Sequence, residues 1–309
     1  MKKLIVVKVG TSSLTEKDGR MSPEKAGDVI RQICDLRDEG HRVVLVSSGA
    51  IAAGFHSLGY TTRPQTIAAK QASAAVGQGL LLEEYTSRLE ARGYVGAQIL
   101  LTRDDFADKR RYTNAFNALE ILIKRGAVPI INENDTIAVD ELKLGDNDTL
   151  ASQVAAMLHA DLLILLTDVA GLYTGNPATD PEAKRIPVVE RITPEIRALA
   201  GDAGSHVGTG GMITKIRGAT LATKAGVPVF ICSSKNADSI KQAVSGEAEG
   251  TLFKAEDSLK TKLQWMAFYS QSAGNLYIDR GAADAVTQHG RSLLPAGIRA
   301  VEGDFKAGD

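Results

Sequence analysis

Apolar runs that end in turns of small polar residues recur along this chain, and they constrain its fold more than any other feature. Residues 4–9 form one such run, rich in β-branched side chains, and the Gly-Thr-Ser-Ser turn at 10–13 follows it. Residues 42–46 repeat the pattern before a turn that begins at Ser47, and a helical segment separates the two runs. This alternation predicts buried parallel strands in an α/β fold. The polar turns should then form a ligand-binding rim at the carboxyl edge of the sheet.

The charge of the chain is balanced, with 36 basic and 37 acidic residues among 309. Such a balance argues against a general nucleic-acid or membrane-surface binder. Cys34 and Cys232 lie far apart in apolar segments, which predicts two reduced, packed thiols in a reducing cytoplasm. No apolar run approaches membrane-spanning length, and the first residues enter a strand pattern without a signal-peptide core.

The remaining elements of the sheet follow from the same patterns. Further strands are expected at residues 94–101, 128–131, 161–166 and 227–232, and helices at 66–92, 112–124, 148–159 and 212–225. Ser22 and Pro23 are typical of a helix N-cap and first turn. Gly77 and Gly79 lie inside an expected helix, so we predict close packing or a break there.

A glycine-rich stretch precedes the expected helix at 212–225. Residues 208–215 read Gly-Thr-Gly-Gly-Met-Ile-Thr-Lys. The glycines let backbone amides approach an anion, and the first amides of a helix point outward without partners. Together they predict a phosphate site at the helix N-terminus, with Lys215 one turn in. The alternative is a surface loop that merely precedes a helix.

Two further groups of residues are candidates for ligand binding. Lys8 lies near the end of a buried strand, where a lysine is costly unless its ammonium meets a negative partner or reaches solvent along its stem. Two Asn- and Asp-rich clusters, at 132–135 and 145–149, carry the groups that could hold an amino acid's ammonium and carboxylate. Asp148, in the second cluster, is equally well explained as a helix N-cap.

The last forty or so residues differ from the rest of the chain. The composition shifts over residues 247–262, and we place a domain boundary near residue 270. From Gly274 the pattern predicts short strands and turns, at 276–278, 281–286 and 290–295. This length is near the lower limit for an independent core, so we expect an incomplete small β domain.

Six motifs stand in one order along the chain, at residues 8–12, 47–54, 132–135, 145–148, 166–168 and 208–212. Together they closely resemble the glutamate 5-kinase family of the amino acid kinase superfamily, from residue 4 to about 253. The tail resembles the first part of a PUA domain without its later strands. The resemblance implies a three-layer αβα sandwich around a mostly parallel sheet, and it divides the chain into a kinase domain (1–258), a linker (259–273) and a partial PUA-like domain (274–309).

The resemblance also implies a reaction, in which the γ-phosphoryl group of ATP passes with Mg²⁺ to the side-chain carboxylate of L-glutamate, the first step of proline biosynthesis. Lys8 and Lys215 are expected to flank the transferred group, with Asp148 holding both lysines in place. The residues implied in glutamate binding are Ser48, Asp135 and Asn147. Those implied in ATP binding are Lys8, Thr167, Asp168, Thr209, Gly210, Gly211, Met212, Ile213, Thr214 and Lys215. The sequence does not select a carboxylate for Mg²⁺.

Partners and alternatives follow from the same resemblance. Proline is expected as a feedback inhibitor at the glutamate site, and the chain is expected to form a dimer or tetramer. One alternative is a kinase of the same fold that phosphorylates acetylglutamate, aspartate or carbamate. Another is an RNA-binding or regulatory protein, suggested by the PUA-like tail. RNA binding is disfavoured because basic and acidic residues offset each other in that tail.

Overall fold

The computed structural model describes residues 1–16, 18–138, 147–177, 179–201, 211–256 and 274–303. The chain divides into two compact units, Met1–Gln264 and Trp265–Asp309. Among the described residues, the larger unit contains a mostly parallel sheet, and the smaller unit contains a pair of antiparallel strands.

The sheet of the larger unit has eight strands in its described part, in the order β3-β4-β2-β1-β5-β7-β8-β6. Its centre is β1 (Leu4–Val9), which pairs in parallel with β2 (Arg42–Val46) and β5 (Leu162–Thr167). The outer strands are β3 (Gly96–Leu101), β4 (Val128–Glu133), β6 (Val188–Val189), β7 (Val229–Ser233) and β8 (Gly250–Phe253). β8 runs antiparallel to β7 and parallel to β6, and the other pairs are parallel. The predicted mostly parallel α/β sheet is confirmed.

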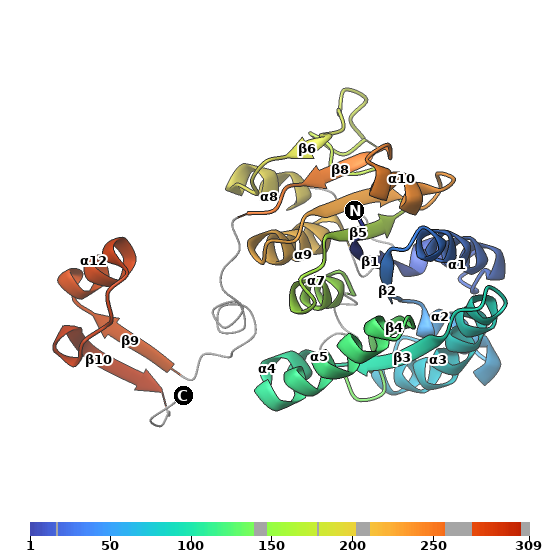
Figure 1. Ribbon diagram of the computed structural model, residues 1–309, viewed down its shortest axis with the longest axis horizontal. Helices are drawn as coiled ribbons and strands as arrows, with labels where there is room; N and C mark the ends of the chain where they lie inside the picture. Colours follow the sequence, from blue (N-terminus) through green and yellow to red (C-terminus); the bar gives the residue numbers. More distant parts are fainter. Residues whose placement is uncertain (17, 139–146, 178, 202–210, 257–273, 304–309) are drawn as a thin grey trace. The chain divides into compact units, whose positions relative to one another are not determined.

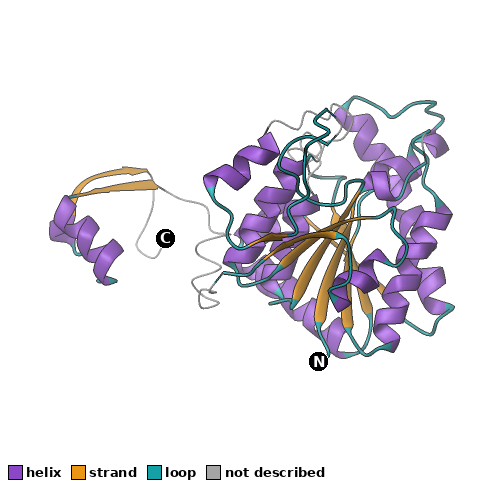
Figure 2. Cartoon of the chain, turned by 90° about the horizontal axis from the view of Figure 1, so that it is seen from above, coloured by secondary structure: helices purple, strands orange, loops and turns teal. Residues whose placement is uncertain are grey.

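Helices cover both faces of this sheet (Figures 1 and 2). One face packs against α1 (Pro23–Asp38), α3 (Ile67–Glu90) and α10 (Ser239–Ser245), which share one hydrophobic core with the strands. The other face carries α5 (Lys109–Lys124), α7 (Asn147–Met157) and α9 (Met212–Lys224). Shorter helices are α2 (Ala50–Gly54), α4 (Arg103–Ala107), α8 (Pro194–Gly201), and the 3₁₀ turns η1 (Thr11–Ser13) and η2 (His56–Leu58).

Local sequence signals explain where two long helices begin and how they pack. The side chain of Ser22 accepts a hydrogen bond from the Lys25 amide at the start of α1, as its pattern predicted. α3 runs unbroken through both of its glycines. A Cβ on Gly77 would lie 1.8 Å from the carbonyl oxygen of Ala50, whereas a Cβ on Gly79 would meet nothing within 4 Å. Close packing therefore occurs at Gly77, where α3 seats directly against α2.

The alternation of side chains along β1 determines where Lys8 points. Val7 and Val9 belong to the core that also contains residues of α1 and α3. Because successive side chains of a strand project to opposite faces, Lys8 must point to the other face, toward α7 and α9. This places a charged side chain in the second helical layer, close to the carboxyl end of the central strand.

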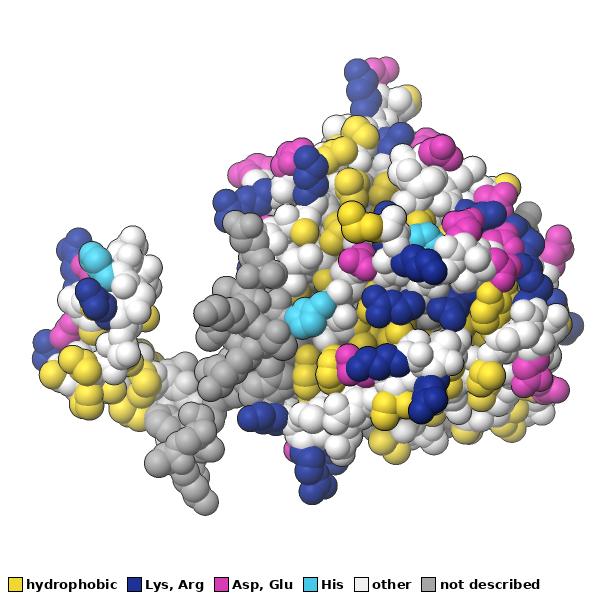
Figure 3. All heavy atoms as spheres, viewed as in Figure 1, with side chains coloured by type: hydrophobic (Ala, Val, Ile, Leu, Met, Phe, Trp, Pro, Cys, Tyr) yellow, Lys and Arg dark blue, Asp and Glu magenta, His cyan; other side chains and the backbone are white. Residues whose placement is uncertain are grey.

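The smaller unit consists of β9 (Gly274–Ile278), α12 (Arg280–His289), the 3₁₀ turn η3 (Pro295–Gly297) and β10 (Ile298–Gly303), with the two strands antiparallel. The strand expected at 281–286 is wrong, because these residues lie in α12. Asp279 caps the helix by accepting from the Ala282 amide, and Gly290 ends it with φ 58°. No described residue of this unit is buried, and apolar side chains lie on its surface (Figure 3).

Three expectations about the chain's environment can be compared with the described residues. Cys34 and Cys232 are both buried free thiols, as predicted, and burial raises the pKa of Cys232 to about 12. No described helix is long and apolar enough to cross a membrane. On the face shown in Figure 3, basic and acidic side chains of the larger unit are interspersed, which fits the balanced composition.

Candidate active site

The polar residues singled out in the sequence meet where the strands of the larger unit end. β1, β2, β4 and β5 are linked by parallel pairing, so their carboxyl ends lie at the same edge of the sheet. The chain leaves β1 toward β2 on one side, and it returns on the other side at β5. Such a reversal of strand order opens a crevice at the carboxyl edge, which is the usual ligand site in open α/β sheets.

Lys8, Asp148 and Lys215 form a buried group that we call the charged trio. The Nζ atom of Lys8 lies 2.6 Å from Oδ1 of Asp148, and Nζ of Lys215 lies 3.1 Å from Oδ2 of the same carboxylate. The exposed fractions are 5% for Lys8, 1% for Asp148 and 6% for Lys215. Three elements distant in sequence, β1, α7 and α9, thus converge on one carboxylate, and they bring together the three residues that the resemblance implied in catalysis.

The electrostatics of the trio keep Asp148 ionised. Burial by itself would raise the pKa of Asp148, but the positive charges of Lys8 and Lys215 outweigh burial and hold that pKa well below its usual value. The hydroxyl of Thr214 lies 2.8 Å from Oδ2 and adds a hydrogen bond to the charged form. The carboxylate therefore serves as a fixed negative anchor between two ammonium groups.

Close helix packing brings Lys215 and Asp148 together. A Cβ on Gly218, one turn after Lys215 in α9, would lie 2.7 Å from Oγ of Ser152 and 3.0 Å from the carbonyl oxygen of Asp148, both in α7. The absence of a side chain at this position lets the two helices approach. Ser152 donates its own hydroxyl to the Asp148 carbonyl at 2.8 Å, which satisfies the buried polar atoms at the contact.

A neutral network lies at the ends of the neighbouring strands. Nδ2 of Asn147 donates to the carbonyl oxygen of Ser47 at 2.5 Å and to Oδ1 of Asn132 at 2.8 Å. Nδ2 of Asn132 in turn donates to Oε1 of Gln78, on α3, at 2.8 Å. We call Gln78, Asn132 and Asn147 the amide relay. It joins the turn after β2, the end of β4 and the start of α7.

The other residues expected to bind glutamate lie beside the relay in the chain. Ser48 is half-buried in the turn after β2, next to the Ser47 carbonyl that accepts from Asn147. Gly49 follows with φ 98°, a left-handed conformation that lets the chain turn directly into α2. Asp135 is half-buried in the turn that follows β4.

The residues expected to bind ATP lie on the β5 and α9 side of the trio. Thr167 is buried at the end of β5, and its hydroxyl donates to Asp168, which is exposed. Gly211 is the N-cap of α9, and the first turn of that helix consists of residues 212–215, of which Ile213 is exposed. Thr209 and Gly210 lie outside the described residues.

Several contacts in this site were not predicted from the sequence. Gln78 was not proposed, and Asn132 was noted only as part of a polar cluster. The contact between Thr214 and Asp148 and the close helix packing at Gly218 were also missed. A glutamine between two glycines in an alanine-rich helix is a weak signal, and nothing local in the sequence says which strand end it faces.

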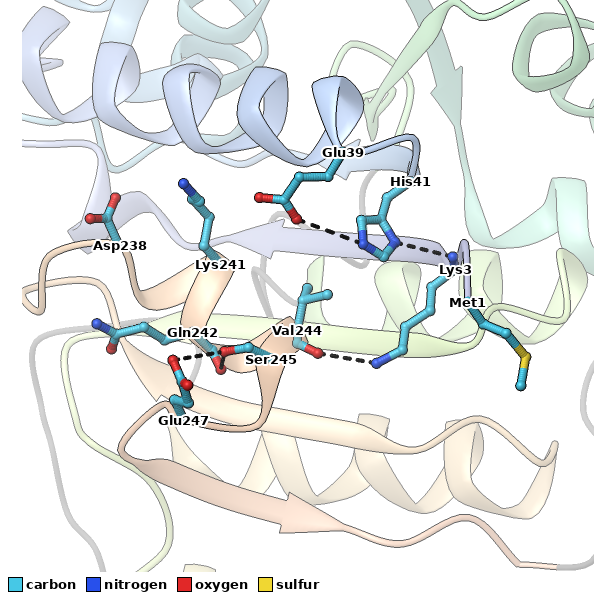
Figure 4. Close-up of a pocket in the computed structure, with 10 residues that line it drawn as sticks. All are labelled: Met1, Lys3, Glu39, His41, Asp238, Lys241, Gln242, Val244, Ser245 and Glu247. Carbon is cyan, nitrogen blue, oxygen red and sulfur yellow. Dashed lines mark hydrogen bonds and ion pairs between the residues drawn. The ribbon is translucent and has the colours of Figure 1, made fainter.

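Two further features bear on what the site can hold. Among the described residues, no group of three or more His, Cys, Asp or Glu side chains could hold a metal ion. A separate pocket of about 550 Å³ lies at the amino end of β1, lined by residues that include Lys3, His41, Lys241 and Gln242 (Figure 4). It contains none of the residues predicted to act in catalysis, and it lies at the opposite end of the central strand from Lys8.

Comparisons with known proteins bear on the family of the chain. Residues 3–233 match the sequence model of the Amino acid kinase family, and residues 274–309 match that of the PUA domain. The chain is 60% identical over 308 residues to Glutamate 5-kinase of Streptococcus pneumoniae (strain Hungary19A-6), covering 99% of this chain and 84% of the relative. It is 59% identical over 304 residues to Glutamate 5-kinase of Streptococcus sanguinis (strain SK36), covering 98% of this chain and 82% of that protein.

Two solved structures share the fold at low sequence identity. Carbamate kinase from Giardia lamblia bound to AMP-PNP has a TM-score of 0.58 at 20% identity, covering 82% of this chain and 99% of that one. UMP kinase from Ureaplasma parvum has a TM-score of 0.56 at 13% identity, with the same coverage. At these identities the likeness concerns the fold alone.

Proposed function

Because the chain belongs to the amino acid kinase family, we propose that it transfers the γ-phosphoryl group of ATP to the side-chain carboxylate of L-glutamate. The products are ADP and L-glutamyl 5-phosphate, whose formation begins proline biosynthesis. The observation that carries the proposal is the charged trio, buried at the carboxyl edge of the sheet and adjoining the amide relay through α7. One side of the site offers positive charge to phosphate, and the other offers neutral polar groups to an amino acid.

The charged trio has the properties that phosphoryl transfer requires. The transferred group carries its charge on oxygens, so catalysis depends mainly on alignment and on cations placed around those oxygens. Lys8 and Lys215 supply these cations from opposite parts of the chain. Asp148, which holds both ammonium groups, fixes where they lie before substrate binds. Preorganisation of this kind lowers the barrier because no reorientation is needed during the reaction.

The acceptor in this reaction is itself a carboxylate, so no general base is needed to remove a proton from it. No histidine is among the residues that we assign to catalysis or to glutamate binding, which are lysine, aspartate, asparagine and serine. We assign glutamate binding to Ser48, Asp135 and Asn147, which lie in or beside the turns after β2 and β4 and at the start of α7.

We assign ATP binding to Lys8, to Thr167 and Asp168 after β5, and to residues 209–215 leading into α9. The support is the helix N-terminus at Gly211, because outward-pointing amides there favour anions. Bound Mg²⁺ would neutralise charge on the phosphate oxygens and hold them in one geometry. An Mg²⁺ ion that accompanies ATP is usually held by phosphate oxygens, water and one or two carboxylates.

The test of the reaction is ADP release from purified protein with ATP and Mg²⁺, with glutamate, acetylglutamate, aspartate and carbamate as alternative acceptors. Hydroxylamine added to the assay traps an acyl phosphate as its hydroxamate. We expect ADP and hydroxamate with glutamate only. Turnover with another acid would identify that acid as the substrate in place of glutamate. No turnover by folded protein with any of the acids would reject the kinase proposal.

The partners of the enzyme and its organisation are part of the same proposal. We infer a cytoplasmic homo-oligomer, dimer or tetramer, that is inhibited by proline competing with glutamate. We also retain the division into a kinase domain (1–258), a linker (259–273) and a partial PUA-like domain (274–309). Light scattering of the purified chain tests the oligomer. Inhibition by proline that is relieved by excess glutamate tests the competition.

A further inference from the structure

Three side-chain amides from distant parts of the chain are connected in series. Gln78 belongs to α3, Asn132 to the end of β4, and Asn147 to the first turn of α7. The exposed fractions of Asn132 and Asn147 are only 2% and 8%, so their hydrogen-bonding groups must be satisfied within the protein or by a ligand. Gln78 is half-buried at the outer end of the series.

Backbone groups at two points fix the direction of this relay. The amide of Glu133 can only donate, and it donates to Oδ1 of Asn132 at 2.8 Å. The carbonyl of Ser47 can only accept, and it accepts from Nδ2 of Asn147 at 2.5 Å. Because these two partners have a fixed polarity, the oxygen and nitrogen of Asn132 and Asn147 cannot be exchanged without losing a hydrogen bond.

The fixed direction decides what Asn147 can offer to a ligand. Its amide nitrogen carries two hydrogens, and both are used, one on the Ser47 carbonyl and one on Asn132. Among the described residues, no donor forms a hydrogen bond to its Oδ1 atom. Asn147 therefore presents a hydrogen-bond acceptor, and it has no donor left for a carboxylate.

We propose that Gln78 is a positioning residue that acts through Asn132 to hold the Asn147 carbonyl oxygen toward the α-ammonium group of the substrate. An ammonium group has donors and no acceptor, so it is the part of an amino acid that complements a lone acceptor. Gln78 completes the arrangement because its Oε1 atom accepts a hydrogen bond from the Asn132 amide nitrogen and keeps that side-chain amide from rotating. The inference rests on the proposed function, since it concerns how the same site recognises glutamate.

A close contact between α3 and α2 holds Gln78 in position. Its neighbour Gly77 allows α3 to lie directly against α2, where a Cβ would come within 1.8 Å of the Ala50 carbonyl. Two turns further along α3, the hydroxyl of Tyr85 lies 2.9 Å from that of Ser47. α3 therefore contacts the turn after β2 through Tyr85 and the end of β4 through Gln78.

The test compares Gln78→Met with Gln78→Glu, which retains an acceptor oxygen. Loss of a partner for a buried amide typically costs enough to change binding about tenfold. We expect Gln78→Met to raise the KM for glutamate by about tenfold, with kcat and the KM for ATP unchanged. Gln78→Glu should stay within about twofold of the wild-type enzyme, because the hydrogen bond to Asn132 is kept.

Glutarate, which is glutamate without its ammonium group, separates recognition from a general disturbance of the site. Its inhibition constant against glutamate should be the same in the wild-type enzyme and in Gln78→Met. Gln242→Met is the matched control, since it makes the same change in the pocket at the amino end of β1 (Figure 4) and should leave every constant unchanged.

The possible outcomes distinguish this inference from the proposed function. A wild-type enzyme that does not turn over glutamate would reject the proposed function and, with it, the role of the relay. Normal wild-type turnover with an unchanged glutamate KM in Gln78→Met would reject the relay alone. An equal rise in the glutamate KM and the glutarate inhibition constant would also reject it, because the effect would not then involve the ammonium group.

Discussion

The charged trio is buried, and so is the amide relay except for the half-buried Gln78. Both reach the carboxyl edge of the sheet, and they meet at two adjacent residues of α7, Asp148 and Asn147. They differ in what they contribute. The trio holds two ammonium groups on one carboxylate, and its effect is greatest on a group whose charge distribution changes during reaction. The relay is neutral and has a fixed direction, so its effect is to select which ligand group it meets. We therefore propose that charge serves the rate in this site and that hydrogen-bond direction serves recognition.

The largest expected effect follows from removing one cation of the trio. Lys215→Ala should lower kcat by roughly 10²–10³-fold or more, because a preorganised charge around the transferred group is lost. The KM for glutamate should change far less. Steady-state kinetics with both substrates measures this separation of kcat from KM.

Lys224→Ala is the matched control for Lys215→Ala. Lys224 is exposed in the last turn of the same helix, α9, and lies outside the trio. It should leave kcat unchanged. Near-normal turnover by Lys215→Ala would show that Lys215 is not needed for catalysis. The proposed catalytic role of the charged trio would then be wrong.

On the recognition side, Asp135→Ala should raise the KM for glutamate by roughly 10–100-fold, the loss that follows when a charged partner is removed. The KM for ATP should stay near its original value. Asp104→Ala, at an exposed position in the first turn of α4, provides the control. Equal increases in the two KM values would show that Asp135 supports the whole site and not the glutamate half.

The two halves also differ in how far the sequence predicted them. Lys8, Asp148 and Lys215 each stand in a local pattern, at a strand end or at the start of a helix, and such ends converge in a parallel sheet. Their joint role, however, was implied by the family resemblance. Gln78 has no local pattern of this kind. Its place depends on how closely α3 packs on α2, which is a tertiary contact made possible by Gly77.

The same reasoning explains the errors and successes in the fold. The buried parallel strands were predicted from continuous apolar runs, because a strand that is covered on both faces needs apolar side chains at nearly every position. Residues 281–286 were wrongly expected to be a strand, because a segment this short does not show whether its apolar residues repeat with the period of a strand or of a helix. The capping residues Asp279 and Gly290, which define α12, lie outside that segment.

Each half of the site depends on one close helix contact, and a methyl group can disturb either. Gly218→Ala should push α9 from α7 and lower kcat, since its Cβ would lie 3.0 Å from the Asp148 carbonyl. Gly77→Ala should push α3 from α2 and raise the KM for glutamate. Each should also lower the free energy of unfolding by roughly 1–3 kcal/mol, the usual effect of overpacking. Chemical denaturation and kinetics measure the two consequences.

Gly79→Ala is the control for both glycine variants, because a Cβ there meets nothing within 4 Å. It should leave the kinetics unchanged and stabilise the protein by up to about 1 kcal/mol, since alanine favours the helix. If Gly218→Ala raised only the glutamate KM, or Gly77→Ala lowered only kcat, the assignment of one helix contact to each half would be wrong.

The smallest expected effect is a difference in acid sensitivity between the two halves. The folded-state pKa of Asp148 lies below its unfolded value of about 3.9, so the folded protein binds fewer protons at this group. The stabilisation is therefore complete above about pH 4 and is lost as the pH falls further through the folded-state pKa. Unfolding by urea at pH 5 and pH 3 should show a smaller loss of stability for Asp148→Asn than for the wild-type protein. Gln78→Met, in the neutral relay, should keep the wild-type loss, and an equal loss in all three proteins would contradict the role of Asp148 as the ionised anchor.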